Sequence, residues 1–303
     1  MQENKLKNYL HLHLIVFIWG FTAILGELIS IEAVPLVWFR MFLAVIFILC
    51  YFLIKRENLK IDTKAIFKFF FSGVIIAIHW ITFFKAIKVS NVSVTLVTMS
   101  TGAFFASIIE PLIFRKKIQP LEIFMGLLVI LGLYIIFNFE GQYIWGIVFA
   151  LISAFSSALF SVLNGLYIKK HKATVISFYQ LLFGGIGVTI FLFFSNQFTN
   201  NFFYLKGSDW FYLVLLSSIC TSYAFIASVK VMKYLTPYTV MLTINLEPIY
   251  GIILALLVLG EKEQMNPEFY YGALIVLLVV ILNGVIKNKS VLIRKISIKK
   301  SLK

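Results

Sequence analysis

The chain of 303 residues is strongly apolar, because 61% of its residues are hydrophobic and only 13% are charged. A soluble protein of this length carries about 25% charged residues to cover its surface, so the composition excludes an ordinary water-soluble globular protein. The formal net charge of +14 would suggest nucleic-acid binding in a soluble protein. Here the Lys and Arg residues are confined to short gaps between apolar stretches, so we expect a membrane protein with no nucleic-acid partner.

A transmembrane helix needs about 20 predominantly apolar residues to cross the hydrocarbon core of a bilayer. Charged clusters and turn residues divide the chain into ten such stretches, with no gap long enough for a soluble domain. The predicted fold class is therefore all-α and polytopic. The predicted transmembrane helices lie at roughly 11–30, 34–54, 66–86, 91–114, 120–138, 144–168, 174–195, 210–229, 237–259 and 269–287.

The distribution of basic residues predicts the orientation of these helices. With the N-terminus in the cytoplasm, the segments on that side hold 22 Lys and Arg residues and the opposite gaps hold 4, with Arg40 inside a span. Cytoplasmic loops carry such an excess, so both termini are predicted to be cytoplasmic, in a bacterial-type inner or plasma membrane. The first span follows Lys5 and Lys7 without a small-residue cleavage site and is interpreted as uncleaved. The basic tail, 289–303, is predicted to lie on anionic lipid.

The two halves of the chain resemble each other. An offset of 146 residues places 84–135 on 230–281 with 8 of 52 positions identical, and Gly126 falls on Gly272. Each half would hold five spans, and because five is odd the second copy must be inverted. The predicted units are therefore 1–138 and 139–288. Inverted repeats are a recurring design of secondary transporters, whose substrate site lies near the bilayer midplane.

Short motifs along the chain follow the order of one known family. They are Ile18-Trp19-Gly20-Phe21, Val37-Trp38-Phe39-Arg40, Ser177-Phe178-Tyr179-Gln180, Leu246-Glu247-Pro248 and Leu259-Gly260-Glu261. Over about residues 10–288 the chain resembles the EamA family of the drug/metabolite transporter superfamily, which are ten-helix exporters. The first half departs from the second, because it has Thr101-Gly102 where the second has Glu247-Pro248. The resemblance implies export of small metabolites, amino acids or toxic compounds by alternating access.

Two ionisable residues deep in the spans are candidates for proton coupling. Glu247 lies near the middle of a span beside Pro248, where a proline breaks the helix and an acid can bind a proton or cation. His79 titrates near neutral pH and lies near the middle of another span, followed by Trp80. A structural role in helix packing is the alternative for both ionisable residues.

We predict a central cavity enclosed by the first, third, fourth, sixth, eighth and ninth spans. Its predicted lining residues are Trp19, His79, Trp80, Thr101, Tyr223, Asn245 and Glu247. Glu27 and Arg40 lie at comparable depths and are expected to form a structural ion pair, with a substrate carboxylate as the alternative partner of Arg40. Ser153, Ser157 and Ser161 share one helix face, which we interpret mainly as a close-packing surface.

The sequence thus favours a secondary active exporter, coupled to protons or driven by exchange, that takes a small-molecule substrate across the bilayer. An intramembrane enzyme or lipid-processing protein and a passive facilitator are the alternatives, and a homodimer is left open. We expect no enzymatic activity, cofactor or metal, because Cys50 and Cys220 offer no metal-binding spacing and no phosphate-binding loop motif is present.

Overall fold

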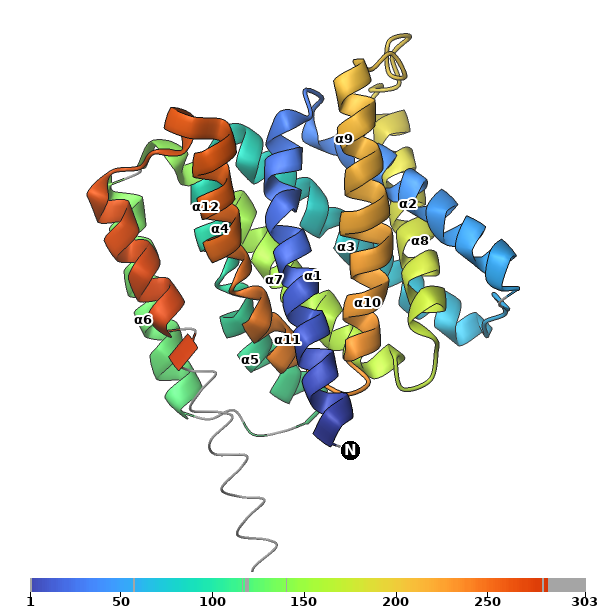
Figure 1. The fold of residues 1–303 in the computed structure, drawn as a ribbon, viewed down its shortest axis with the longest axis horizontal. Helices are drawn as coiled ribbons and strands as arrows, with labels where there is room; N and C mark the ends of the chain where they lie inside the picture. Colours follow the sequence, from blue (N-terminus) through green and yellow to red (C-terminus); the bar gives the residue numbers. More distant parts are fainter. Residues whose placement is uncertain are drawn as a thin grey trace, which may run out of the picture.

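The computed structural model describes residues 2–56, 58–115, 117, 120–139, 141–279 and 281–282. Within these ranges the chain is a bundle of helices without a strand (Figure 1). The first half forms α1 (Gln2–Leu28), α2 (Ala33–Lys55), α3 (Thr63–Val89), α4 (Val92–Met99), α5 (Gly102–Ile113) and α6 (Pro120–Phe139). The second half forms the 3₁₀ turn η1 (Gly141–Tyr143), α7 (Ile144–Tyr167), α8 (Ala173–Phe194), α9 (Gly207–Ser217), the π-helix η2 (Ser218–Tyr223), α10 (Ala224–Val231), α11 (Pro237–Ile244), α12 (Glu247–Leu259), the 3₁₀ turn η3 (Gly260–Glu263) and an apolar helix at Pro267–Val279.

The prediction of an all-α polytopic membrane protein is confirmed. In the described part of the chain, eight helical segments are long and apolar enough to cross a membrane. They match eight of the ten predicted spans. The other two predicted spans correspond to α6 and to the shorter helix at Pro267–Val279, so the count of ten stays a prediction. The predicted basic tail, 289–303, lies outside the described residues.

Side chains that cap helix starts explain several boundaries along the chain. The Asp62 carboxylate accepts a hydrogen bond from the Ala65 amide at 2.7 Å before α3, and the Asn91 side chain accepts one from the Val94 amide at 2.8 Å before α4. An N-cap of this kind satisfies an amide that the helix leaves unpaired. A side chain in the preceding gap therefore fixes the start of each of these two helices.

In the described part of the chain, two equivalent spans are interrupted near their centres by a tight turn. The span 92–113 breaks at Ser100–Thr101, between α4 and α5, and the span 237–259 breaks at Asn245–Leu246, between α11 and α12. At both places the backbone bonds run from residue i to i−3, as in the 3.1 Å bond from the Thr101 amide to the Thr98 carbonyl. In the second break, Pro248 also lacks the amide that would continue the helix. Equivalent spans of the two halves are thus broken at equivalent depths.

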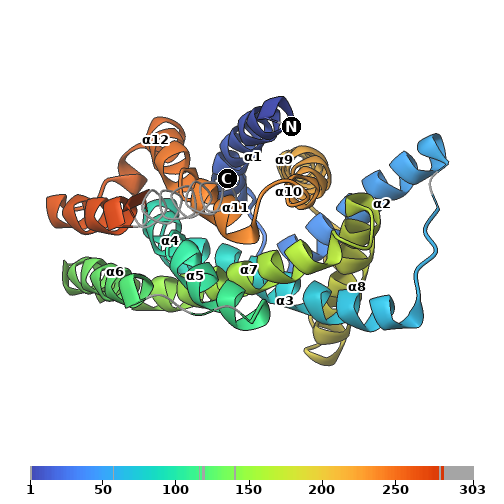
Figure 2. The same cartoon turned by 90° about the horizontal axis from the view of Figure 1, so that it is seen from below.

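The helices pair in a symmetric pattern that follows the two halves of the chain. Helix α3 of the first half packs on α7 of the second half, and correspondingly α10 of the second half packs on α1 of the first. The broken spans cross each other, because α4 contacts α12 and α5 contacts α11. That pairing requires the two spans to run in opposite directions, as in inverted repeats. Figure 2, viewed from below, shows α12, α1 and α9–α10 along one side of the bundle, with α7 and α3 below them in that picture.

Glutamates from each broken span cap the start of the other. The Glu263 carboxylate, after α12, accepts bonds from the Val92 and Ser93 amides at the start of α4, at 3.0 and 2.8 Å. The Glu110 carboxylate, in α5, accepts one from the Tyr238 amide in α11 at 2.8 Å. Negative charge at a helix N-terminus is stabilising. The two carboxylates therefore hold the crossed pair at both of its ends.

Candidate functional site: the central cavity

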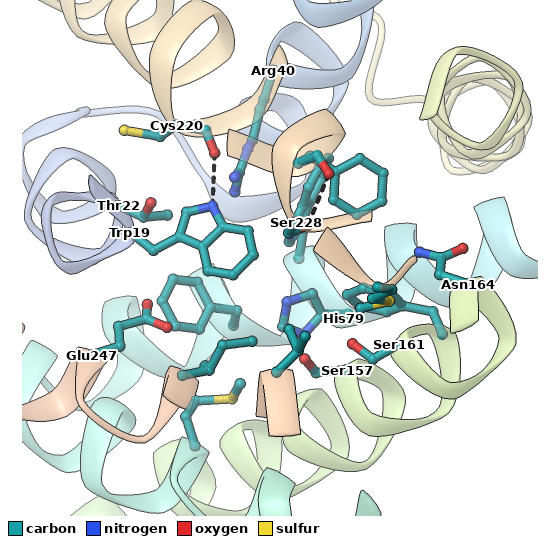
Figure 3. A pocket seen from close by; sticks show the side chains of 18 residues that line it. Trp19, Thr22, Arg40, His79, Ser157, Ser161, Asn164, Cys220, Ser228 and Glu247 are labelled. Atoms are coloured by element: carbon teal, nitrogen blue, oxygen red, sulfur yellow. Dashed lines mark hydrogen bonds between the residues drawn. The ribbon is translucent and has the colours of Figure 1, made fainter. Parts of the chain in front are cut away.

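A cavity of about 70 Å³ lies at the centre of the bundle, beside the break before α12 (Figure 3). Its walls come from α1, α2, α3, α4, α7, η2, α10, α11 and α12, so both halves of the chain contribute. All six spans predicted to enclose a cavity take part, and α2 adds a wall that was not predicted. A volume of this size holds a few water molecules and is well below the roughly 300–1,000 Å³ of pockets for drug-sized ligands.

Arg40 supplies a cation to the cavity from α2. Its side chain is only 2% exposed, its Nε donates a hydrogen bond to the Thr221 hydroxyl at 2.7 Å, and its Cζ lies 3.8 Å from the Trp80 ring centroid. Its Nη1 has no hydrogen-bond partner among the described residues. A buried charge is ordinarily paired, so the group is poised to accept an anionic partner that enters the cavity.

The π-helical segment η2 explains how Thr221 reaches Arg40. The Thr221 and Ser222 hydroxyls donate to carbonyls five residues earlier, those of Leu216 and Ser217, at 2.8 and 2.7 Å. A π-helical turn holds an extra residue, which changes the direction in which the following side chains point. Such turns are frequent at functional sites. It also exposes the Cys220 carbonyl, which accepts a hydrogen bond from the Trp19 indole at 3.0 Å (Figure 3).

Glu247 brings a carboxylate to the same cavity as the first residue of α12. Its side chain is half-buried, and no hydrogen bond or ion pair joins it to another residue of the described chain. Figure 3 shows Arg40 and Glu247 on different sides of the cavity, with the Trp19 indole between them in this view. The cavity thus carries two opposite formal charges, each able to interact with a ligand.

His79 lines the cavity from α3 but is also tied to α7. Its Nδ1 lies 3.0 Å from the Ser153 carbonyl oxygen and 2.8 Å from the Ser153 hydroxyl, which donates in turn to the His79 carbonyl at 2.9 Å. These contacts fix the ring orientation and leave Nε2 as the nitrogen that can meet a ligand. The ring also packs against Phe160, with centroids 5.3 Å apart. His79 therefore joins two helices as well as forming part of the wall.

Four of the seven predicted lining residues come together at this cavity: Trp19, His79, Trp80 and Glu247. Thr101, Tyr223 and Asn245 do not line it. Thr101 donates its hydroxyl to the Thr98 carbonyl within the break at 2.8 Å. Tyr223 is 45% exposed and lies 2.9 Å from His11 Nε2 on the outside of the bundle. Asn245 is buried in the other break, 2% exposed. Depth in the membrane was a poor guide for these three, because it does not say which way a side chain points.

The ion pair expected between Glu27 and Arg40 is not formed. Arg40 turns inward to Trp80 and Thr221. At the end of α1, the Lys88 ammonium donates to the backbone carbonyls of Glu27 and Ile29, at 3.4 and 2.5 Å. Although Glu27 and Arg40 lie at similar depths along their helices, Arg40 contacts the cavity residues, whereas the end of α1 at Glu27 contacts Lys88.

A polar face of α7 also lines the cavity, through Ser157, Ser161 and Asn164. Residues at these spacings share one face of a helix, so the sequence indicated a common polar face. Because serine is small, that face was interpreted as a close-packing surface and not as part of a cavity wall. The Asn164 side-chain oxygen accepts a hydrogen bond from the Gln180 amide at 2.7 Å. That bond links the polar face of α7 to α8.

Comparison with known proteins agrees with this architecture. The profile of the EamA-like transporter family matches the chain twice, over residues 6–138 and 144–285. A curated relative from Clostridium kluyveri, described as an uncharacterized transporter, is 27% identical over 195 residues, which cover 60% of this chain and 60% of the relative. A protein of known crystal structure shares the fold at a TM-score of 0.68 and 12% identity, over 93% of this chain and 98% of the other. Because the family matches cover most of its length, the chain belongs to the EamA-like transporter family.

Proposed function

We propose that the protein is a secondary active transporter that exports a small zwitterionic solute, such as an amino acid, in exchange for protons. The observation that carries the proposal is the placement of Arg40 and Glu247 around one enclosed cavity. A guanidinium binds a carboxylate strongly, and the unpartnered Nη1 of Arg40 is available for one. The Glu247 carboxylate would then hold the ammonium group of the same molecule.

In this proposal, transport is coupled to protons because a proton and the substrate compete for the Glu247 carboxylate. Desolvation inside the membrane favours the neutral, protonated form of a carboxyl group. A substrate ammonium group interacts favourably only with the ionised form, so a proton and the substrate exclude each other. If the cavity opens alternately to the two sides of the membrane, each substrate that leaves is replaced by a proton that enters.

The walls and the broken helices suit this use. Trp19 and Trp80 offer aromatic faces to the apolar part of a solute or to its cation. The breaks before α5 and α12 lie where the two halves cross, and discontinuous helices form the substrate sites of many secondary transporters. The present volume of about 70 Å³ means that the cavity must widen to load such a solute.

Purified protein in liposomes tests the proposal. A panel of amino acids is loaded inside, an acidic exterior is imposed, and efflux of each is compared with efflux at equal pH. Efflux that accelerates with the proton gradient for one or more amino acids, but not for analogues lacking the amino group, supports antiport of a zwitterion. Equal efflux with and without the gradient would favour a passive facilitator instead.

A further inference from the structure

A second and larger hollow, of about 560 Å³, lies on the side of the bundle where α1, α2, α8 and α10 meet. We call it the α2–α10 groove, and its lining includes Lys172, Lys230, Lys233, Phe47, Ile48 and Ile226. It shares no lining residue with the central cavity. We propose that this groove binds one anionic glycerophospholipid of the cytoplasmic leaflet, with the phosphate at the lysines and an acyl chain along the apolar wall.

The charges of the groove are arranged at one end. Lys230 lies in the last turn of α10, Lys233 follows that helix, and Lys172 immediately precedes α8. All three belong to segments that the charge bias assigns to the cytoplasmic side. No aspartate or glutamate lines the groove in the described part of the chain. A basic pocket between transmembrane helices on that side fits an anionic lipid headgroup.

The deeper part of the groove suits an acyl chain. Its apolar lining includes Phe47 and Ile48 from α2 and Ile226 and Ala227 from α10. The hydroxyl groups there are already occupied, because Ser218 donates to the Val214 carbonyl at 2.6 Å and Ser222 donates to the Ser217 carbonyl at 2.7 Å. A hydroxyl whose hydrogen is bonded internally adds little polarity to the wall.

The length of the groove matches one leaflet. Its lining extends along the helix from Ser218 to Lys230, which at 1.5 Å per residue is about 18 Å. Half of a hydrocarbon core is about 15 Å thick. A lipid whose phosphate lies at Lys230 would therefore place its acyl chain beside Ser218, near the bilayer centre. The exposed side chains of Tyr51 and Tyr223, at 41% and 45%, lie in the same groove and show that it opens at the surface of the bundle.

Native mass spectrometry of the full-length protein tests the proposal. The protein is released from mixed micelles that contain equal amounts of phosphatidylglycerol and phosphatidylcholine. We expect one phosphatidylglycerol molecule to be retained. The double variant Lys230→Gln/Lys233→Gln should weaken retention by about tenfold or more, and Lys230→Arg/Lys233→Arg should keep it. The matched control Lys64→Gln/Lys68→Gln removes two exposed lysines near the start of α3, outside the groove, and should change retention less than about twofold.

The variant Ile226→Trp separates a lipid from a free anion. The larger Trp side chain fills the space proposed for the acyl chain and leaves the lysines in place. If the groove binds a lipid, this variant should therefore lose phosphatidylglycerol. If inorganic phosphate displaces the bound lipid, the groove is a soluble-anion site and the proposal is wrong. If Ile226→Trp retains the lipid fully, the apolar wall does not hold an acyl chain, and the proposal is wrong as well. Equal retention of phosphatidylcholine, or equal loss in the Lys64→Gln/Lys68→Gln control, would also overturn it.

Discussion

The guanidinium carbon of Arg40 lies 3.8 Å from the centroid of the Trp80 ring, in the interior of a membrane-spanning bundle. The Nε of the same guanidinium donates a hydrogen bond to the Thr221 hydroxyl at 2.7 Å. Arg40 and Trp80 come from α2 and α3, and Thr221 comes from the second half of the chain. The positive charge of the cavity is thus held by an aromatic face and one neutral hydrogen bond, with Nη1 left for a ligand.

Replacing Arg40 by lysine tests this arrangement. Arg40→Lys keeps the charge but loses the Nε bond to Thr221 and the planar contact with Trp80. We expect the transport rate at low substrate concentration to fall by about tenfold or more, because a charged hydrogen bond is lost, at unchanged membrane abundance. Arg56→Lys, at the end of α2 and outside the cavity, is the matched control. If the Arg40→Lys variant transports substrate at the wild-type rate, Arg40 does not bind the substrate.

The crossing of α3 and α8 depends on a pair of glycines. A Cβ atom on Gly73 would overlap the Gln180 carbonyl oxygen and lie 3.0 Å from the Gly184 amide nitrogen. Gly73→Ala should therefore destabilise the protein by about 1–3 kcal/mol. At Gly187, on the same helix as Gly184, a Cβ would meet nothing closer than 3.8 Å. Thermal unfolding in detergent should show a lower midpoint for Gly73→Ala and little change for Gly187→Ala. Equal midpoints would show that α3 and α8 can move apart to accept a methyl group at position 73, which would contradict the prediction.

The fold class could be predicted from the sequence because it depends on the composition of long segments. Apolar stretches of about 20 residues and the asymmetry of Lys and Arg depend on the membrane itself and not on tertiary packing. Pro248 also marked the break before α12, since a proline removes a backbone donor. The matching break at Ser100–Thr101 carries no proline, and it became visible only in the structure.

The site was predictable only in part. Glu247, His79, Trp19 and Trp80 line the cavity as expected because rare polar and aromatic groups deep in a span tend to face the bundle interior. The direction of Arg40 could not be read from the sequence, because it depends on the π-helical register of η2, which positions Thr221. Tyr223 lies in that same π-helix and points outward.

The carboxylate of Glu263 should be a major stabiliser of the crossed spans. Glu263→Ala removes the acceptor for the Val92 and Ser93 amides. Leaving buried amides unpaired costs about 1–3 kcal/mol each, so the free energy of unfolding should fall by at least about 2 kcal/mol. Glu261→Ala changes an exposed residue two positions away and should have little effect. Denaturant unfolding of the two variants decides this, and equal stability would show that the cap is not important.

The predicted topology has a direct test. A reporter fused after Lys303 should be active on the cytoplasmic side, whereas one inserted at Asn200, between α8 and α9, should be active on the opposite side. The two positions are separated by an odd number of predicted spans. Reporters that give the same side would show that the arrangement of ten spans is wrong.

The central claim is that Glu247 is the group at which protons and substrate compete. Glu247→Gln keeps the shape of the side chain and removes its titration. The measurement is transport in liposomes at matched protein abundance, with and without a proton gradient, using Glu261→Gln as the control. We expect Glu247→Gln to lose gradient-driven transport but to keep exchange of substrate for substrate, and Glu261→Gln to behave as wild type. Gradient-driven transport that persists in Glu247→Gln would contradict the account and make His79 the group to examine.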